Sequence, residues 1–270
     1  SRVRVSSPAH KTLKNFIENG FSVVPVAEEK ALTEIRSRLV TGLRAAMPGG
    51  DGLDDDAYLN HFHEFADMSQ LNEVRVRVHR EVCAAEDFRH LVFRSVRKYL
   101  VDLIGNEMVM QRQVNFVAQM PKDPTALLYL HTDVWAGNSP YEVILWLPLV
   151  SVYETKSMYI CDRKNSWKYL NEFKQGLKLE STAKLLEKIR PDLQQLKMSF
   201  GEALLFSPTL FHGSEENKTQ ETRFILNVRF KSLFSPYGAK ALGETFTPVN
   251  YLPATEIGLT YETDFGATHG

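Results

Sequence analysis

One stretch decides the fold of this chain: Gly201-Glu-Ala-Leu-Leu-Phe-Ser-Pro-Thr-Leu-Phe-His-Gly-Ser214. Its apolar run predicts a β-strand that leads up to His212. Residues 221–230 predict another strand, whose alternation puts a set of side chains on one face: Arg223, Ile225, Asn227 and Arg229.

Further short strands are predicted upstream. Apolar and polar residues alternate over residues 106–121, which indicates one or two half-buried strands. Residues 125–131 lead into a His-Thr-Asp motif, and residues 141–150 and 157–161 are strand-like runs. Many short strands without β-α-β alternation predict a mainly β fold with added helices, most simply a jelly roll (double-stranded β-helix).

The His-Thr-Asp motif is a candidate metal site. On an extended strand alternate side chains share a face, so His131 and Asp133 point to the same side. With His212 from a distant strand they form a 2-His-1-carboxylate set, which is typical of non-haem Fe(II) enzymes that keep coordination positions open for a co-substrate and O2. Taken alone, His131 and Asp133 also fit a hydrogen-bonded pair without metal; His212 and Arg223 favour the metal site.

Residues 115–230 resemble the Fe(II)/2-oxoglutarate dioxygenases, in particular the phytanoyl-CoA-hydroxylase-like branch. That branch carries H-x-D, a G-[DE]-x-L-x-F-x-P-x-x-x-H-G-S strand and a following Arg. Residues 11–25 also resemble its opening helix and strand, and residues 131–143 are similar to oxygenases of bacterial surface-carbohydrate gene clusters. The matching residues here are Gly201, Glu202, Leu204, Phe206, Pro208, His212, Gly213, Ser214, Asn217 and Arg223.

The resemblance implies an enzyme that uses Fe(II), 2-oxoglutarate and O2. It implies that 2-oxoglutarate chelates the iron and needs a cation for its C5 carboxylate, a role that suits a guanidinium fork. Arg223 has the family spacing for this role, with Arg229 as the alternative or as a substrate contact. Ser214, with Asn115 or Gln119, is expected to complete the hydrogen bonds around the co-substrate.

The expected reaction is hydroxylation of a carbohydrate or a sugar-derived intermediate, with 2-oxoglutarate converted to succinate. Relatives that halogenate lack the carboxylate that Asp133 supplies here. A substrate mouth is expected at Trp135, Asn138, Asn227 and Arg229. A purely structural role is the alternative for these residues: Trp135, Tyr141 and Trp146 would pack in the core or at the rim, and Asn138 would form a turn.

Other functions stay open at this point. The same cofactors support desaturation, epimerisation, or an amino-acid or lipid substrate. A non-oxygenase jelly roll, either a sugar-binding module or a cupin-like isomerase, is the alternative from another class. Arg223 argues against it, because an isomerase needs no cation for 2-oxoglutarate.

Two clusters outside the motif have simpler explanations. His61, His63, Glu64 and Asp67 fall in residues 57–68, which predict an amphipathic helix with Leu59, Phe62, Phe65 and Ala66 turned inward. We expect the imidazoles of His61 and His63 to be hydrated or hydrogen-bonded within the protein, without a metal. Residues 75–80 and 89–98 are basic and read as packed helices with a charged outer face; a docking strip for a phosphorylated or nucleotide-linked sugar is the alternative.

The whole chain sets further bounds. With 270 residues and 43% hydrophobic content it can bury one substantial core, and its net charge of −1 offers no bulk attraction to nucleic acid or anionic membranes. No apolar run has the length of a membrane span, and we expect no signal peptide ahead of Lys11. Cys83 and Cys161 form no disulfide framework and fit a reducing cytoplasm. The partner is expected to be a small molecule or glycan; the oligomeric state stays open, a homodimer included.

A single dioxygenase domain, 1–270, is expected. Residues 9–105 predict mostly helical support, with strong patterns over 27–47 and over 86–104, the latter ending at Gly105 as a C-cap. Residues 106–161 and 197–235 predict the jelly-roll core. Residues 162–196 interrupt it with two helical segments and form a candidate lid over the site.

Overall fold

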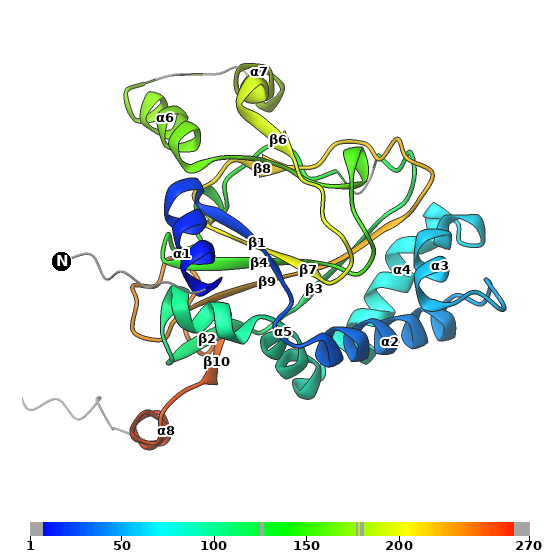
Figure 1. The fold of residues 1–270 in the computed structure, drawn as a ribbon, viewed down its shortest axis with the longest axis horizontal. Helices are drawn as coiled ribbons and strands as arrows, with labels where there is room; N and C mark the ends of the chain where they lie inside the picture. Colours follow the sequence, from blue (N-terminus) through cyan, green and yellow to red (C-terminus); the bar gives the residue numbers. More distant parts are fainter. Residues whose placement is uncertain (1–7, 125–126, 177, 179–180, 262–270) are drawn as a thin grey trace, which may run out of the picture.

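The larger of two β-sheets runs through the middle of the molecule (Figure 1). The computed structural model describes residues 8–124, 127–176, 178 and 181–261. The strands follow the order β1-β7-β4-β9-β2-β10, and β3 also pairs with β9. Their ladders are antiparallel. The bounds are β1 Phe21–Pro25, β2 Met108–Gln111, β3 Asn115–Gln119, β4 Glu142–Pro148, β7 Glu202–Phe206, β9 Arg223–Ser232 and β10 Phe246–Asn250.

The smaller sheet has the order β6-β5-β8. Its strands are β5 Tyr159–Cys161, β6 Leu193–Gln195 and β8 His212–Gly213. An isolated antiparallel bridge joins His131 to His212 beside it. Two antiparallel sheets with long-range pairing confirm the predicted jelly roll. The strand β6 lies within the predicted insertion, and β10 lies beyond the predicted core.

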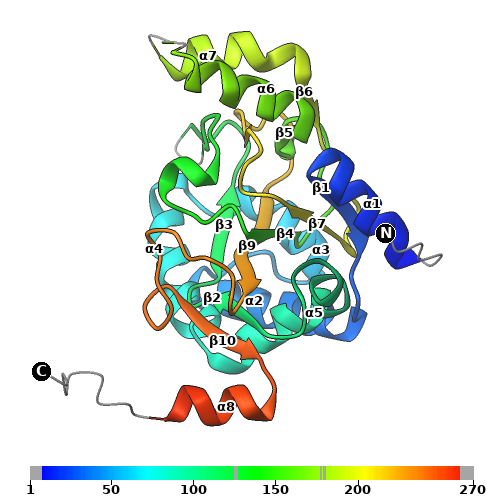
Figure 2. The same cartoon turned by 90° about the vertical axis from the view of Figure 1, so that its left-hand side faces the viewer.

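Helices from the N-terminal part cover one side of the larger sheet (Figures 1 and 2). They are α1 Pro8–Asn19, α2 Glu29–Ala46, α3 Asp55–Asn60, α4 Met68–Val78 and α5 Glu86–Ile104. Their apolar faces and the sheet form the main core, in which Ile35, Val92 and Phe230 are fully buried. As predicted, α5 ends at Gly105, whose φ of 90° lies in the region that favours glycine.

The prediction of one continuous helix over residues 57–68 is wrong, because the structure has a short helix and a separate turn there. The helix α3 stops at Asn60, and a short 3-10 turn, η1 Phe62–Glu64, follows. Asp67 cannot continue a helix here, because its side chain accepts a hydrogen bond from Ser69 N and caps α4 instead. The expected inward side chains Leu59, Phe62 and Ala66 are nevertheless buried.

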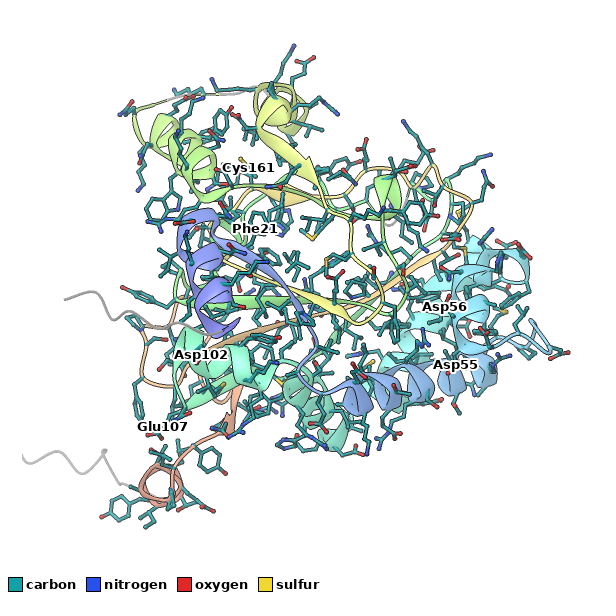
Figure 3. The ribbon with its side chains drawn as sticks, viewed as in Figure 1. Phe21, Asp55, Asp56, Asp102, Glu107 and Cys161 are labelled. Atoms are coloured by element: carbon teal, nitrogen blue, oxygen red, sulfur yellow. The ribbon has the colours of Figure 1, made fainter. Side chains whose placement is uncertain are left out.

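The insertion forms α6 Arg163–Lys174 and α7 Thr182–Ile189 beside the smaller sheet, at the top of Figure 2. Residues 177 and 179–180 between them, like residues 125–126, lie outside the described residues. The inner faces of both helices share a separate apolar cluster with Leu130, Cys161 and Phe211. Cys161 can be followed in Figure 3, next to α6. The insertion therefore packs on residues that directly precede His131 and His212.

The C-terminal part adds a helix that the sequence reading did not predict. The helix α8, Pro253–Thr260, has no buried residue and stands apart from the sheets in Figure 2. Among the described helices, none has both the length and the apolar character needed to cross a membrane. Cys83 and Cys161 are both buried and free, and burial raises the pKa of the Cys83 thiol to about 12.

Candidate active site

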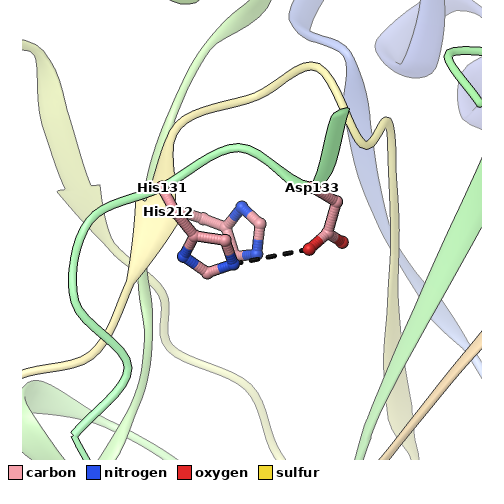
Figure 4. A group of neighbouring side chains, drawn as sticks. All are labelled: His131, Asp133 and His212. Carbon is pink, nitrogen blue, oxygen red and sulfur yellow. Dashed lines mark ion pairs between the residues drawn. The ribbon is translucent and has the colours of Figure 1, made fainter. Parts of the chain in front are cut away.

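Three side chains converge where the bridge between residues 131 and 212 meets a 3-10 turn (Figure 4). His131 and His212 exchange backbone hydrogen bonds of 3.1 and 3.0 Å. Asp133 opens the turn η3, Asp133–Ala136, after an extended Thr132 (φ −121°, ψ 143°). The extended residue turns Thr132 into the interior while His131 and Asp133 face the same point, as the alternation predicts.

Backbone carbonyls orient both imidazoles. His131 Nδ1 lies 2.8 Å from Tyr129 O, and His212 Nδ1 lies 3.0 Å from Leu210 O. Since each Nδ1 must donate to its carbonyl, each Nε2 keeps its lone pair for a metal.

The spacing of these atoms fits one metal ion. His131 Nε2 is 3.4 Å from Asp133 Oδ1, and the ligand atoms of all three residues lie within 4.8 Å of one another. Adjacent ligands around an octahedral ion with bonds of about 2.1 Å stand about 3 Å apart. Two imidazoles and one carboxylate on one side of the ion are the donor set of non-haem Fe(II).

The electrostatics favour the protonation states that a metal needs. Burial is the main cause that lowers the pKa of His212, to about 4, so this imidazole is neutral at pH 7. Burial acts to raise the pKa of Asp133, but the hydrogen bond with His131 and the charges of His212 and Arg229 outweigh it and hold the pKa far below its usual range. Both groups are therefore ready to bind a cation without losing a proton at neutral pH.

Gly213 permits the close approach of strands at this point. A Cβ there would lie 2.6 Å from Leu128 O and 2.5 Å from the Tyr159 hydroxyl. Any side chain would push the His212 strand away from the chain that carries His131. Steric exclusion of a side chain therefore explains why the His-Gly-Ser motif has glycine at its second position.

The three residues line a cavity of about 710 Å³ between the two sheets. The predicted face of β9 forms one wall of it, with Arg223, Ile225, Asn227 and Arg229. Apolar side chains from other strands complete the inner part: Val117, Trp146, Met158 and Phe206. A volume in this range suits a small organic ligand, for which pockets of about 300–1,000 Å³ are usual.

Arg223 is buried in this wall with few partners. Its side chain donates one hydrogen bond, from Nη1 to Ser157 O at 3.3 Å, and its buried Nε has no partner among the described residues. Burial lowers the pKa of Arg223 to about 10, which still leaves it charged at pH 7. A buried cation with spare donors is costly unless an anion joins it, so this residue fits the far carboxylate of 2-oxoglutarate.

Arg229 is already engaged. Its Nη2 lies 2.9 Å from Asp133 Oδ2, and its Nη1 donates to Gln111 Oε1 at 3.1 Å. It therefore orients the carboxylate of the three-residue group.

The other expected co-substrate contacts divide into two sets. Ser214 and Asn115 line the cavity, and Ser214 Oγ accepts a hydrogen bond from Leu128 N at 3.2 Å. Gln119 stands opposite Arg223 in the β3–β9 ladder but is not part of the cavity lining, and its amide donates to Glu215 O at 2.9 Å.

The expected substrate residues are also divided. Asn227 lines the cavity, and its buried Oδ1 has no partner among the described residues. Asn138 is buried and bonds to Asp133 O and Lys240 Nζ, which matches its simpler interpretation as a turn residue. Trp135 is 51% exposed and packs edge-on against Phe173 and Phe211, outside the cavity lining.

His61 and His63 do not join a metal-binding group. His63 Nδ1 bonds to Thr222 Oγ1 at 3.0 Å, and His61 Nδ1 bonds to Glu64 at 2.8 Å. Within the part of the chain that the structure describes, His131, Asp133 and His212 are the one group with metal-ligand spacing.

One wall of the cavity includes part of the basic segment 75–80, for which the sequence offered a docking strip only as the alternative to a charged outer face. It comes from one face of α4 and of the π-helical turn after it, η2 His79–Cys83. We call it the α4 wall: Asn72, Arg75, Val76 and His79. Their spacing of three and four residues was a usable signal, but only tertiary packing shows that this face meets the cavity.

The comparisons with known proteins agree with this geometry. The phytanoyl-CoA dioxygenase family model matches residues 165–225, a segment that contains His212, Ser214 and Arg223. No curated protein sequence matches the chain.

Solved structures share the fold at low sequence identity. The non-haem monooxygenase ThoJ in complex with nickel is 15% identical, with a TM-score of 0.56 over 88% of this chain and 83% of that one. EctD from S. alaskensis is 16% identical, with a TM-score of 0.57 over 89% and 85%. HygX from Streptomyces hygroscopicus, solved with nickel and 2-oxoglutarate bound, is 16% identical, with a TM-score of 0.50 over 84% and 88%.

The chain shares its fold with solved non-haem oxygenases, the phytanoyl-CoA dioxygenase family model matches residues 165–225, and His131, Asp133 and His212 have metal-ligand spacing. These findings agree with the resemblance of the sequence to 2-oxoglutarate-dependent oxygenases. The resemblance to the phytanoyl-CoA-hydroxylase-like branch is confirmed.

Proposed function

We propose that this oxygenase hydroxylates a C–H bond of a carbohydrate or sugar-derived intermediate. One observation carries the proposal: His131, Asp133 and His212 share a cavity with Arg223, a buried cation that lacks partners. A metal group and a spare guanidinium in one cavity are what iron and 2-oxoglutarate need together.

In this proposal each residue has one task. The Nε2 atoms of His131 and His212 and the carboxylate of Asp133 bind Fe(II). Arg223 binds the C5 carboxylate of 2-oxoglutarate, and Ser214 and Asn115 complete its polar surroundings. Arg229 keeps Asp133 in place through its 2.9 Å ion pair.

When bound, iron with 2-oxoglutarate and O2 supplies the oxidising power: substrate C–H, O2 and 2-oxoglutarate become C–OH, succinate and CO2. The protein positions the reactants and limits the entry of water. Trp146, Met158 and Phe206 give the cavity an apolar inner part beside the histidines. These side chains lower the local polarity beside the histidines.

The carboxylate of Asp133 favours hydroxylation over halogenation, because it occupies the position that halogenating relatives leave for chloride. A sugar is supported by amides in the cavity wall, Asn72, Gln113, Asn115 and Asn227, which can pair with hydroxyl groups. Trp135 can serve only at the rim, since it lies outside the cavity lining.

The test is a substrate screen under O2 with succinate as the readout. Panels of sugars, sugar nucleotides, amino acids and acyl thioesters are incubated with the Fe(II)- and 2-oxoglutarate-loaded enzyme. We expect a sugar derivative to stimulate succinate formation and to gain one oxygen atom, seen by mass spectrometry. Stimulation by an acyl thioester or amino acid alone would remove the carbohydrate proposal, and a product two hydrogens lighter would replace hydroxylation with desaturation.

A further inference from the structure

We propose that the α4 wall is an anion-binding subsite, and that the substrate carries a carboxylate or phosphate group which Arg75 binds. The inference rests on the proposed function, since it names the kind of substrate that enters the same cavity. It is carried by the placement and the missing partners of Arg75.

Arg75 has a partly buried side chain at the cavity. Its Nε is buried without a hydrogen-bond partner, and no ion pair joins its guanidinium to a carboxylate within residues 8–124, 127–176, 178 and 181–261. Burial lowers the pKa of Arg75, while the charge of Asp123 acts in the opposite direction. A desolvated guanidinium with its fork unused is suited to a bidentate anion.

Two other arginines of α4 and the turn η2 do have a carboxylate partner, Glu81 of η2. Arg77, two residues along α4, forms an ion pair with Glu81 at 3.1 Å, and Arg80 contacts the same carboxylate. Arg75 projects from a different face of α4, toward the cavity, where it reaches neither.

The charges of the cavity lining are not balanced. Among the described residues that line the cavity, Asp133 is the single carboxylate, and Arg229 pairs with it. In the proposed function 2-oxoglutarate takes Arg223. Among the described residues of the lining, Arg75 is then the one arginine that has neither a carboxylate at ion-pair distance nor the co-substrate as its partner.

Polar groups surround Arg75 on the same side of the cavity. His79 lies one turn further on, and Asn72 lies one turn before; Asn115 begins β3, and Gln113 lies in the bend just before that strand. The helix α4 and the turn η2 both pack against β3, which brings these groups together. They offer hydrogen bonds to an anion and to the hydroxyl groups next to it.

The backbone at His79 has a rare geometry. Residues 79–83 form a π-helical turn, and such turns are frequent at functional sites. The helix α2 fixes this turn at Gly42, where a Cβ would lie 2.9 Å from Val82 Cγ2. The close packing holds His79 and Arg75 toward the cavity.

Titration calorimetry with small anions tests the proposal without knowledge of the substrate. Inorganic phosphate and acetate are titrated, at constant ionic strength, into protein loaded anaerobically with Fe(II) and 2-oxoglutarate, so that Arg223 is occupied. Arg75→Gln is compared with Arg77→Gln, which removes the same charge from an exposed position of the same helix. Arg75→Lys and Arg77→Lys repeat the comparison if Arg75→Gln does not fold.

We expect Arg75→Gln to weaken binding of one or both anions at least about tenfold, the scale of a charge-assisted hydrogen bond, and Arg77→Gln to change it less than twofold. Preference for phosphate or for acetate then identifies the anionic group. Equal affinities in both variants, or no binding to the wild type, would overturn the subsite. The absorption band of the Fe(II)–2-oxoglutarate complex, recorded first, reports separately on the proposed function: if it is missing, that function fails, whatever the anions do.

Discussion

Arg229 forms an ion pair with Asp133 on the side of the carboxylate that faces away from His131. The Nη2 atom of Arg229 lies 2.9 Å from Asp133 Oδ2, while Asp133 Oδ1 lies 3.4 Å from His131 Nε2. Both arginines of the β9 face have the right sequence position to bind 2-oxoglutarate. The contacts distinguish them, because Arg229 is paired with the carboxylate of Asp133 and bonded to Gln111, whereas Arg223 donates a single bond to a backbone carbonyl and has no carboxylate partner among the described residues.

Arg223→Lys should therefore weaken 2-oxoglutarate binding by about 1–3 kcal/mol, since an ammonium cannot replace a bidentate fork. Anaerobic titration followed by the absorption of the Fe(II)–2-oxoglutarate complex measures the affinity. Arg229→Lys is the matched control and should change it much less. Unchanged affinity in Arg223→Lys, with a loss in Arg229→Lys, would transfer the role to Arg229.

Arg229→Met should instead lower the affinity for the metal. Partners that orient a metal ligand typically contribute about 10–100-fold to affinity, and this variant removes the ion pair that fixes Asp133. Competition with a chelator measures Fe(II) or Ni(II) binding. If Arg229→Met binds metal as the wild type does, Arg229 has no part in orienting Asp133.

Asp133→Ala should abolish turnover of 2-oxoglutarate coupled to substrate oxidation. The variant leaves two imidazoles without the carboxylate that completes the group. Succinate and oxidised product are quantified together, with and without chloride. Full activity that does not depend on chloride would contradict the assignment of Asp133 as a ligand.

The metal-free protein should lose stability as the pH falls from about 6.5 toward 4. Burial lowers the pKa of His212 from 6.5 to about 4 in the folded state, so between these values the unfolded chain binds a proton that the folded chain does not. The sign follows: the free energy of unfolding decreases as the pH is lowered, by up to roughly 3 kcal/mol from this group.

Urea denaturation of chelator-treated protein at pH 7.5 and 4.5 measures this decrease. His212→Gln removes the titrating group, so the variant should lose less stability than the wild type over the same interval. An equal loss in both proteins would show that His212 is not held neutral by burial.

Local patterns in the sequence were sufficient where one element decides the geometry. The alternation over residues 221–230 gave the cavity face of β9, and His131 and Asp133 flank an extended Thr132 as expected. The end of α5 at Gly105 followed from the conformational freedom of glycine.

Features that depend on packing between distant segments escaped the sequence reading. The helix α3 ends at Asn60 and Asp67 caps the next long helix, α4, and apolar periodicity encodes neither of these boundaries. The α4 wall and the pairing of Arg229 with Asp133 require the folded arrangement of β9, η3 and α4. A charged side chain looks the same in a sequence whether it faces solvent or a cavity.

The insertion over residues 162–196 remains a predicted lid, and its contacts suggest how to test it. Phe173 of α6 packs edge-on against Trp135 with ring centres 5.5 Å apart, which links the insertion to the turn that follows Asp133. Its inner face shares an apolar cluster with Leu130 and Phe211, the residues before the two histidines. If the insertion is a lid, these contacts break when the site is empty and form when ligands are bound. If it is a permanent brace, the contacts persist in both states.

Hydrogen exchange separates the two. For a lid, amides of α6 should exchange faster than those of β4, and should slow when metal, 2-oxoglutarate and substrate are bound. Phe173→Ala should raise the ratio of succinate to oxidised product, because a loosened lid admits water, while Lys164→Ala on the exposed side of α6 should leave the ratio unchanged. Exchange in α6 as slow as in β4, both with and without ligands, would make the insertion a brace for the histidine-bearing segments, since its packing on Leu130 and Phe211 would then never open.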